Sequence, residues 1–173
     1  TPEERFSVAE CYTWADVEEA INLANDFDSI AIDHFTNVQE LLYKDLMAKK
    51  NAKQMSLNLY GEASTILRAF IDTLVRLSYS GKNVYVICQQ KSVNVEEVTD
   101  ENVPAQIIPN LMESVSKYLT ASSRILGHTE RITKSKIVKG NKKVKDFYQV
   151  RLAGNPVYNL KVTRKQGLAI PDT

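Results

Sequence analysis

Two short apolar runs near the centre of the chain constrain its fold more than any other feature. Residues 29–33 read Ser-Ile-Ala-Ile-Asp, residues 83–88 read Asn-Val-Tyr-Val-Ile-Cys, and polar residues follow each run. Both runs are too short for helices and are typical of strands buried on both faces of a parallel sheet. An alternating run at residues 6–11 adds a further expected strand.

Helical patterns separate the expected strands. Apolar residues recur at helical spacing over residues 38–46 and 66–77, and Gly81 is placed to end the second helix in a left-handed conformation. An earlier helix should begin after Thr13, because its hydroxyl faces Asp16 three residues later in a variant of the capping box. The chain therefore alternates strands with helices.

This alternation over residues 5–90 predicts an α/β fold of the doubly wound kind, with a mostly parallel sheet and helices on both faces. Residues 91–105 are acidic and poor in apolar groups, so we expect a solvated loop there, and residues 107–119 have the pattern of a short helix. A C-terminal β-hairpin region follows, with expected strands at 132–138, 144–152 and 158–162.

The charge pattern divides the chain at the same place. Although the net charge is +1, residues 1–123 sum to −8 and residues 124–173 sum to +9. We therefore interpret residues 1–173 as one domain, with an α/β core at 5–123 and a basic β-rich part at 124–173. A 43% hydrophobic composition and the lack of a long apolar run exclude a disordered chain and a membrane span.

Other sequence features favour the cytoplasm. The N-terminus has no apolar segment of the kind found in signal peptides. Cys11 and Cys88 both lie in apolar runs, which favours buried thiols in a reducing compartment over a disulfide framework.

Polar residues follow the two central runs, where ligands of parallel sheets bind. Asp33 ends its run as the acid of a Walker B strand does, where a carboxylate holds the water shell of nucleotide-bound Mg²⁺; the alternative is an ordinary helix N-cap. Gln89 and Gln90 follow the second run, where an amide can hydrogen-bond a γ-phosphate; the alternative is a polar strand exit.

The expected hairpin is rich in basic residues, and clustered cations of this kind neutralise phosphates without reading bases. The candidates for contact with DNA are Arg131, Lys134, Lys136, Lys139, Lys142, Lys143 and Lys145. Phe147 and Tyr148 are positioned to add base stacking. The alternative is a solvated hairpin whose aromatic residues belong to the core.

Short motifs lie at residues 13–17, 27–33 with 36–40 behind them, 81–84 and 161–164. In these motifs the chain resembles the phage-encoded AAA/RecA-like ATPases of recombination and single-strand annealing, and the resemblance covers most of the chain. It implies a RecA-like P-loop NTPase core that binds ATP, with Mg²⁺ under Asp33 and a sensor glutamine at Gln89 or Gln90. It also implies stacked subunits, in which Lys161 or Arg164 of one copy reaches the nucleotide of the next.

The sequence departs from this family at three places. It contains no G-x-x-x-x-G-K-[ST] phosphate loop, so we expect Thr1 to lie downstream of the P-loop portion and the chain alone neither to bind ATP tightly nor to hydrolyse it. His34 replaces the small hydroxyl residue usual after the acid, where it either caps the next helix or contacts a phosphate. The acidic loop at 91–105 disfavours DNA contact there.

We therefore expect an ATP-binding RecA-like phage protein of the host cytoplasm, which couples ATP hydrolysis to binding or annealing of single-stranded DNA. Its expected partners are further copies of itself and a phage single-strand binding protein, with no membrane. The first alternative is a non-catalytic DNA- or protein-binding module on a nucleotide-binding scaffold. The second is an unrelated α/β enzyme with a small-molecule pocket at the same sheet edge.

Overall fold

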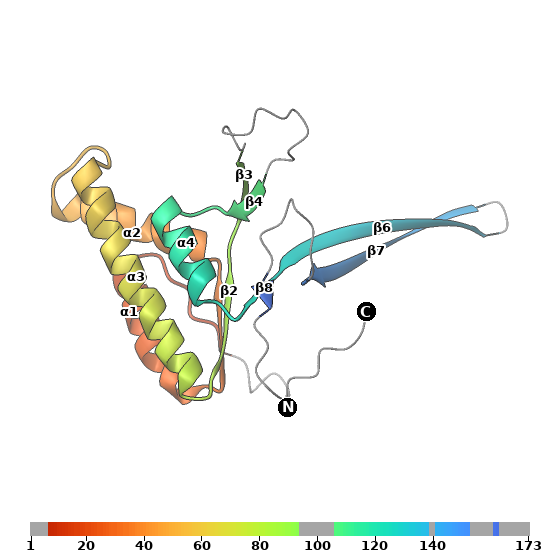
Figure 1. The fold of residues 1–173 in the computed structure, drawn as a ribbon, viewed down its shortest axis with the longest axis horizontal. Helices are drawn as coiled ribbons and strands as arrows, with labels where there is room; N and C mark the ends of the chain where they lie inside the picture. The colour runs from red at the N-terminus through yellow and green to blue at the C-terminus, as the bar shows by residue number, and fades with distance from the viewer. Residues whose placement is uncertain (1–6, 94–105, 139–140, 153–160, 163–173) are drawn as a thin grey trace. The chain divides into compact units, whose positions relative to one another are not determined.

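The computed structural model describes residues 7–93, 106–138, 141–152 and 161–162 (Figure 1). Over these residues the fold is mixed α/β, with four α-helices and with strands paired in sheets of two. The chain divides into two compact units. The first comprises residues 1–90 and 109–122, and the second comprises residues 91–108 and 123–173.

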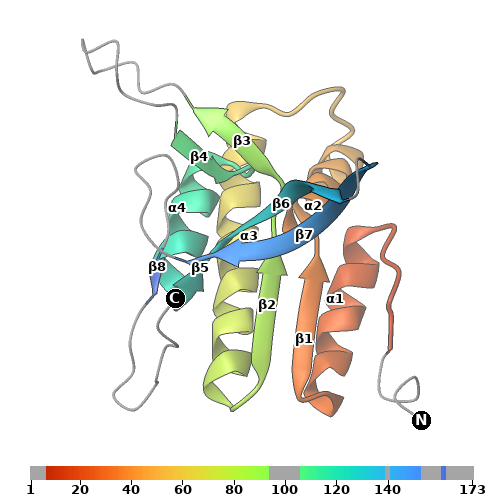
Figure 2. The same cartoon turned by 90° about the vertical axis from the view of Figure 1, so that its right-hand side faces the viewer.

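The first unit contains a parallel strand pair and all four described helices. In chain order its elements are α1 (Trp14–Leu23), the 3₁₀ helix η2 (Ala24–Asp26), β1 (Ser29–Asp33), α2 (Phe35–Lys49), α3 (Leu57–Tyr79), β2 (Asn83–Ile87) and α4 (Glu113–Ser122). β1 and β2 run in the same direction, with Ser29 opposite Asn83 and Asp33 opposite Ile87 (Figure 2). The predicted parallel pairing of these two runs is confirmed.

Local signals in the sequence set the helix ends. The Thr13 hydroxyl and the Asp16 carboxylate form the expected capping box at the start of α1. Ser56 caps α3 by accepting the N–H of Leu59 at 3.4 Å. Gly81 follows the end of α3 with φ of +99°, a conformation that is strained for residues with a Cβ. The helix expected to end at this glycine is therefore confirmed.

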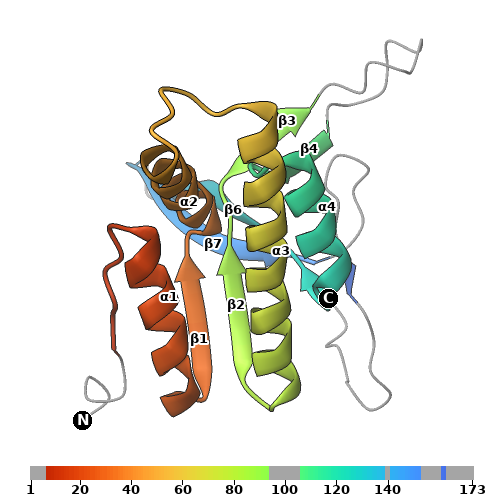
Figure 3. The ribbon, with the colours of Figure 1, turned by 90° about the vertical axis from the view of Figure 1, so that its left-hand side faces the viewer.

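The expectation of helices on both faces of a larger sheet is wrong for the described residues. The described helices lie on one side of the β1–β2 pair (Figure 3). Both strands accordingly alternate exposed and half-buried residues, with Tyr85 58% exposed and Ile87 48% exposed, rather than being buried on both faces. The apolar sequence of a strand does not show whether helices pack against both of its faces.

Two expected elements also differ from the structure. Residues 7–11 form no strand, because they have no strand partner among the described residues. The helix expected over 107–119 begins only at Glu113, because residues 106–109 pair as strand β4. The short apolar stretch Ile107–Ile108 fits either period, so the pairing decides its structure.

The apolar face of α3 lies at the centre of the first unit's core, where residues of α1, α2 and α4 join it. The largest fully buried side chains are Phe35, Leu42, Leu67, Ile71, Leu111 and Val115. Phe70 contacts Trp14 edge-on with ring centroids 5.7 Å apart, and its ring also lies 5.9 Å from that of Phe35. One helix therefore joins the other three through continuous apolar packing.

The second unit consists of paired strands. β3 (Gln90–Val93) pairs with β4 (Gln106–Pro109), β5 (Ile125–Leu126) with β8 (Lys161–Val162), and β6 (His128–Val138) with β7 (Asn141–Arg151). β6 and β7 form a long antiparallel ribbon (Figure 1), which confirms the predicted hairpin. Residues 91–93 are strand where a loop was expected, and residues 94–105, 139–140 and 158–160 lie outside the described part.

Leu67→Ala should destabilise the protein by about 2–5 kcal/mol, because Leu67 is fully buried and the truncation leaves a cavity within the core. Leu57→Ala is the matched control, since it makes the same change on the same helix at a residue that is 86% exposed, and it should cost less than about 0.5 kcal/mol. Urea unfolding monitored by circular dichroism measures both changes. Equal losses in the two variants would contradict the central role of α3.

Candidate functional site

The carboxyl ends of β1 and β2 form the first candidate site. Because Asp33 pairs with Ile87, the residues that follow both strands lie at one edge of the pair, as the sequence predicts. The Asp33 carboxylate is exposed and has no hydrogen-bond or ion-pair partner among the described residues. Asp33 is therefore available to a ligand and does not cap α2.

His34 provides the cap of α2. Its Nδ1 atom accepts the backbone N–H of Asn37 at 3.3 Å, so the capping role considered for this histidine is confirmed. Its Nε2 atom lies 3.2 Å from Nε2 of Gln89, the residue that follows β2 by two positions. The two strand ends are thus linked through side chains of His34 and Gln89.

Two buried polar side chains of α2 accept hydrogen bonds from the backbone at Gln89 and near the start of α4. Thr36 is 6% exposed and its hydroxyl accepts the N–H of Gln89 at 3.1 Å. The Gln89 carbonyl accepts the N–H of Asn110 at 2.6 Å. Gln39, also 6% exposed, accepts the N–H of Met112 at 2.8 Å, just before α4 begins. Together these bonds join α2, the end of β2 and the start of α4.

Sequence reasoning noted residues 36–40 only as part of the family resemblance and assigned no role to Thr36 or Gln39. A signal was present, because two polar residues three positions apart occupy the same helix face as the apolar residues of α2. Buried polar groups of this kind are normally hydrogen-bonded, and here each satisfies a backbone N–H.

The described residues at this edge offer one carboxylate, that of Asp33, to a metal ion. The described residues contain no group of three or more His, Cys, Asp or Glu side chains placed to hold a metal. A single exposed carboxylate fits Mg²⁺ that keeps its waters and takes phosphate oxygens from a nucleotide, as Mg²⁺ commonly does. Asp33 is the residue that would hold such an ion.

The structure shows the following about the other residues predicted at the nucleotide. Gln90 begins β3 and is exposed, and no described bond joins it to Asp33 or His34. Lys161 pairs with Leu126 in the second unit. Arg164 lies outside the described residues.

Both cysteines are free thiols and both are half-buried. Burial raises the pKa of the Cys88 thiol to about 11, and burial, followed by the charge of Asp16, raises the pKa of Cys11. A thiol with a raised pKa is a poor nucleophile, because little of it is ionised near neutral pH. Neither cysteine therefore suits covalent catalysis.

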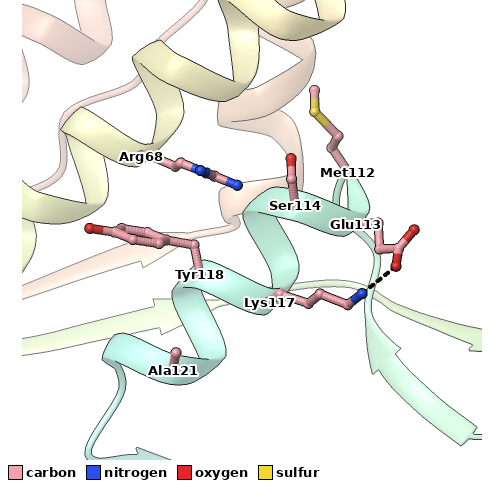
Figure 4. Close-up of a pocket in the computed structure, with 7 residues that line it drawn as sticks. All are labelled: Arg68, Met112, Glu113, Ser114, Lys117, Tyr118 and Ala121. Atoms are coloured by element: carbon pink, nitrogen blue, oxygen red, sulfur yellow. Dashed lines mark hydrogen bonds and ion pairs between the residues drawn. The ribbon is translucent and has the colours of Figure 1, made fainter.

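A shallow groove of about 620 Å³ lies between α3 and α4 (Figure 4). The Arg68 guanidinium is 5.5 Å from the centroid of the Tyr118 ring, and the Tyr118 hydroxyl donates to Asp72 at 2.7 Å. Lys117 forms an ion pair with Glu113 at 2.6 Å. Glu113 therefore offsets the charge of Lys117, whereas the Arg68 guanidinium faces an aromatic ring.

The β6–β7 ribbon forms the second candidate site, and its register sorts the predicted basic residues by face. Lys134 is opposite Lys145 and Lys136 is opposite Lys143. Opposed residues share a face, and so do residues two positions apart, so these four residues occupy one face, called here the lysine face. Lys142 pairs with Ile137 on the other face, and Lys139 lies outside the described residues.

Arg131, the remaining predicted contact, lies on the other face and has a partner. It forms an ion pair with Asp146, which also accepts from the Thr133 hydroxyl at 2.7 Å. Hydrogen bonds from Arg131 and Thr133 lower the pKa of Asp146, so this carboxylate stays charged near neutral pH. Its negative charge offsets Arg131, which makes Arg131 a weaker phosphate contact than its sequence position implies.

Neither a family model, nor a curated protein, nor a solved structure matches this chain. The function is therefore inferred from the residues and their geometry alone. Among the described residues, no helix is both long enough and apolar enough to cross a membrane.

Thr36→Val should destabilise the protein by about 1 kcal/mol, because it removes the acceptor of the part-buried Gln89 N–H while keeping the side-chain shape. Thr65→Val is the control, because the Thr65 hydroxyl is exposed and donates only to the Gly61 carbonyl of its own helix, and the change should stay within about 0.5 kcal/mol. Thermal or urea unfolding compares them. If Thr36→Val were as mild as its control, the proposed anchoring of Gln89 would be wrong.

Proposed function

We propose that this protein binds single-stranded DNA through the lysine face of the β6–β7 ribbon, without reading the base sequence. The observation that carries the proposal is the register, which opposes Lys134 to Lys145 and Lys136 to Lys143. Like charges placed directly across a strand pair destabilise it, so such an arrangement favours a polyanion as ligand. No Asp or Glu lies on this face between the Ile132–Phe147 pair and the end of the ribbon.

The spacing of the lysine pairs supports a polymeric ligand. Residues two positions apart along a strand are separated by about 6.6–6.8 Å, a distance on the scale of neighbouring phosphates in an extended single strand. Two consecutive lysine pairs can therefore hold consecutive phosphates. Binding of this kind gains free energy by releasing condensed counterions and depends strongly on salt.

Changing Lys134, Lys136, Lys143 and Lys145 together to Gln should weaken binding of a thymidine oligonucleotide and reduce the slope of log K against log salt by about 1.4, since each of the two phosphates held by the lysine pairs contributes about 0.7 on a single strand. Fluorescence anisotropy at several salt concentrations measures the slope. The matched control changes Lys44, Lys49, Lys50 and Lys53 to Gln, which removes the same charge from the first unit. An equal loss in the control would reduce the effect to net charge, and an unchanged slope in the first variant would contradict the proposal.

A second candidate function is nucleotide binding at the β1–β2 edge, as in the RecA-like ATPases that the sequence resembles. The observation that favours it is the meeting of the exposed Asp33 carboxylate with the linked pair His34 and Gln89 at one strand edge. Asp33 would hold Mg²⁺ through its water shell, and the Gln89 amide would donate to a phosphate oxygen. A bound Mg²⁺ would supply charge neutralisation to the phosphates.

Asp33→Ala should lower the affinity for ATP in the presence of Mg²⁺ by about tenfold or more, a loss typical of weakened metal binding. Asp28→Ala is the control, because Asp28 is a similarly exposed acid just before the opposite end of β1. Isothermal titration with and without Mg²⁺ measures both variants. ATP affinity that is identical in the two variants would leave the ribbon as the functional site and favour a non-catalytic binding module.

A further inference from the structure

We infer that Phe147 makes the ribbon selective for single strands over duplexes by stacking a base at the end of the lysine face. The inference rests on the proposed DNA binding and adds the residue that determines its specificity. The sequence offered two neighbouring aromatic residues, Phe147 and Tyr148, for stacking. The register of the ribbon places these two residues on opposite faces.

Phe147 lies on the lysine face. It is opposite Ile132, and this pair directly precedes the pair of Lys134 and Lys145 on the same face. Its side chain is 40% exposed, so part of the ring is accessible to a base. A strand whose phosphates follow the lysine pairs would bring its next base to this ring, one step of about 6.6–6.8 Å along the ribbon.

Tyr148 lies on the opposite face, where it is paired with Arg131. It is 79% exposed, so exposure alone would make it the better stacking platform. The cation beside it is paired with Asp146, and that face therefore offers little to hold a phosphate nearby. A strand bound on the lysine face would be separated from Tyr148 by the ribbon itself.

The lysine face offers no further favourable contact to a phosphate just beyond Phe147. The next pair on this face is Glu130 with Gln149, and Glu130 forms an ion pair with Arg151 at 2.8 Å. Hydrogen bonds from Arg151 and Gln149 lower the pKa of Glu130, so its negative charge offsets the charge of Arg151 and this pair adds little attraction for phosphate beyond Phe147. One aromatic residue and two lysine pairs thus define a short site of roughly three to four nucleotides, at the small end of single-strand sites.

The two kinds of contact discriminate differently between ligands. Lysines contact phosphates of single strands and duplexes alike. A base can stack on an aromatic ring only when it is not already stacked and paired within a double helix, and each such contact contributes substantially to single-strand affinity. Phe147 should therefore affect single-strand binding alone.

The test compares Phe147→Leu with Tyr148→Leu on a thymidine oligonucleotide and on a duplex of equal length at one salt concentration. Leucine keeps an apolar side chain opposite Ile132, so the ribbon pairing is retained. Phe147→Leu should weaken single-strand binding about fivefold to a hundredfold, and duplex binding less than twofold. Tyr148→Leu should change the affinities for single strand and duplex less than twofold. Phe147→Trp keeps an aromatic ring and should therefore keep the preference for single strands.

The outcomes distinguish a failure of the stacking role of Phe147 from a failure of DNA binding by the lysine face. An equal loss on single strand and duplex in Phe147→Leu, or an equal effect of Tyr148→Leu, would overturn the stacking role. If the four-lysine variant lost affinity while Phe147→Leu bound normally, only this inference would fail. If the four-lysine variant also bound like the unaltered protein, the proposed function itself would fail.

Discussion

Burial of the apolar face of α3 is the interaction on which the first unit depends. This helix runs from Leu57 to Tyr79, and its buried residues pack with α1, α2 and α4 in one apolar cluster. The parallel pair β1–β2 needs that support, because two parallel strands joined by a long crossover gain little stability from their own hydrogen bonds. The placement of Asp33 beside the residues after β2 therefore depends on the packing of α3, an element distant from Asp33 in the sequence.

Sequence reasoning succeeded where structure follows from neighbouring residues. The cap formed by Thr13 and Asp16, the positive φ of Gly81 and the antiparallel ribbon all depend on short stretches of chain, and each was predicted. It failed where a distant element decides. The exposed alternation of Tyr85 and Ile87 depends on which faces are covered, and an apolar run carries no information about its cover.

The candidate sites were predicted only in part. Grouping Asp33 with Gln89 required only the rule that ligands bind at the carboxyl ends of parallel strands, and the register agrees with it. The ion pair of Arg131 with Asp146 was not foreseen, since it depends on which residues oppose each other across the ribbon. The same unknown register hid the difference between Phe147 and Tyr148, although both were recognised as candidates.

If DNA binds as we propose, the opposed lysines give salt two effects of opposite sign. Added ions would screen like charges paired across the ribbon, so its pairing would strengthen as ionic strength rises. The same ions would compete with the phosphates of the proposed ligand and weaken its binding. At low ionic strength, a bound polyanion would therefore serve as the counterion of the opposed lysines.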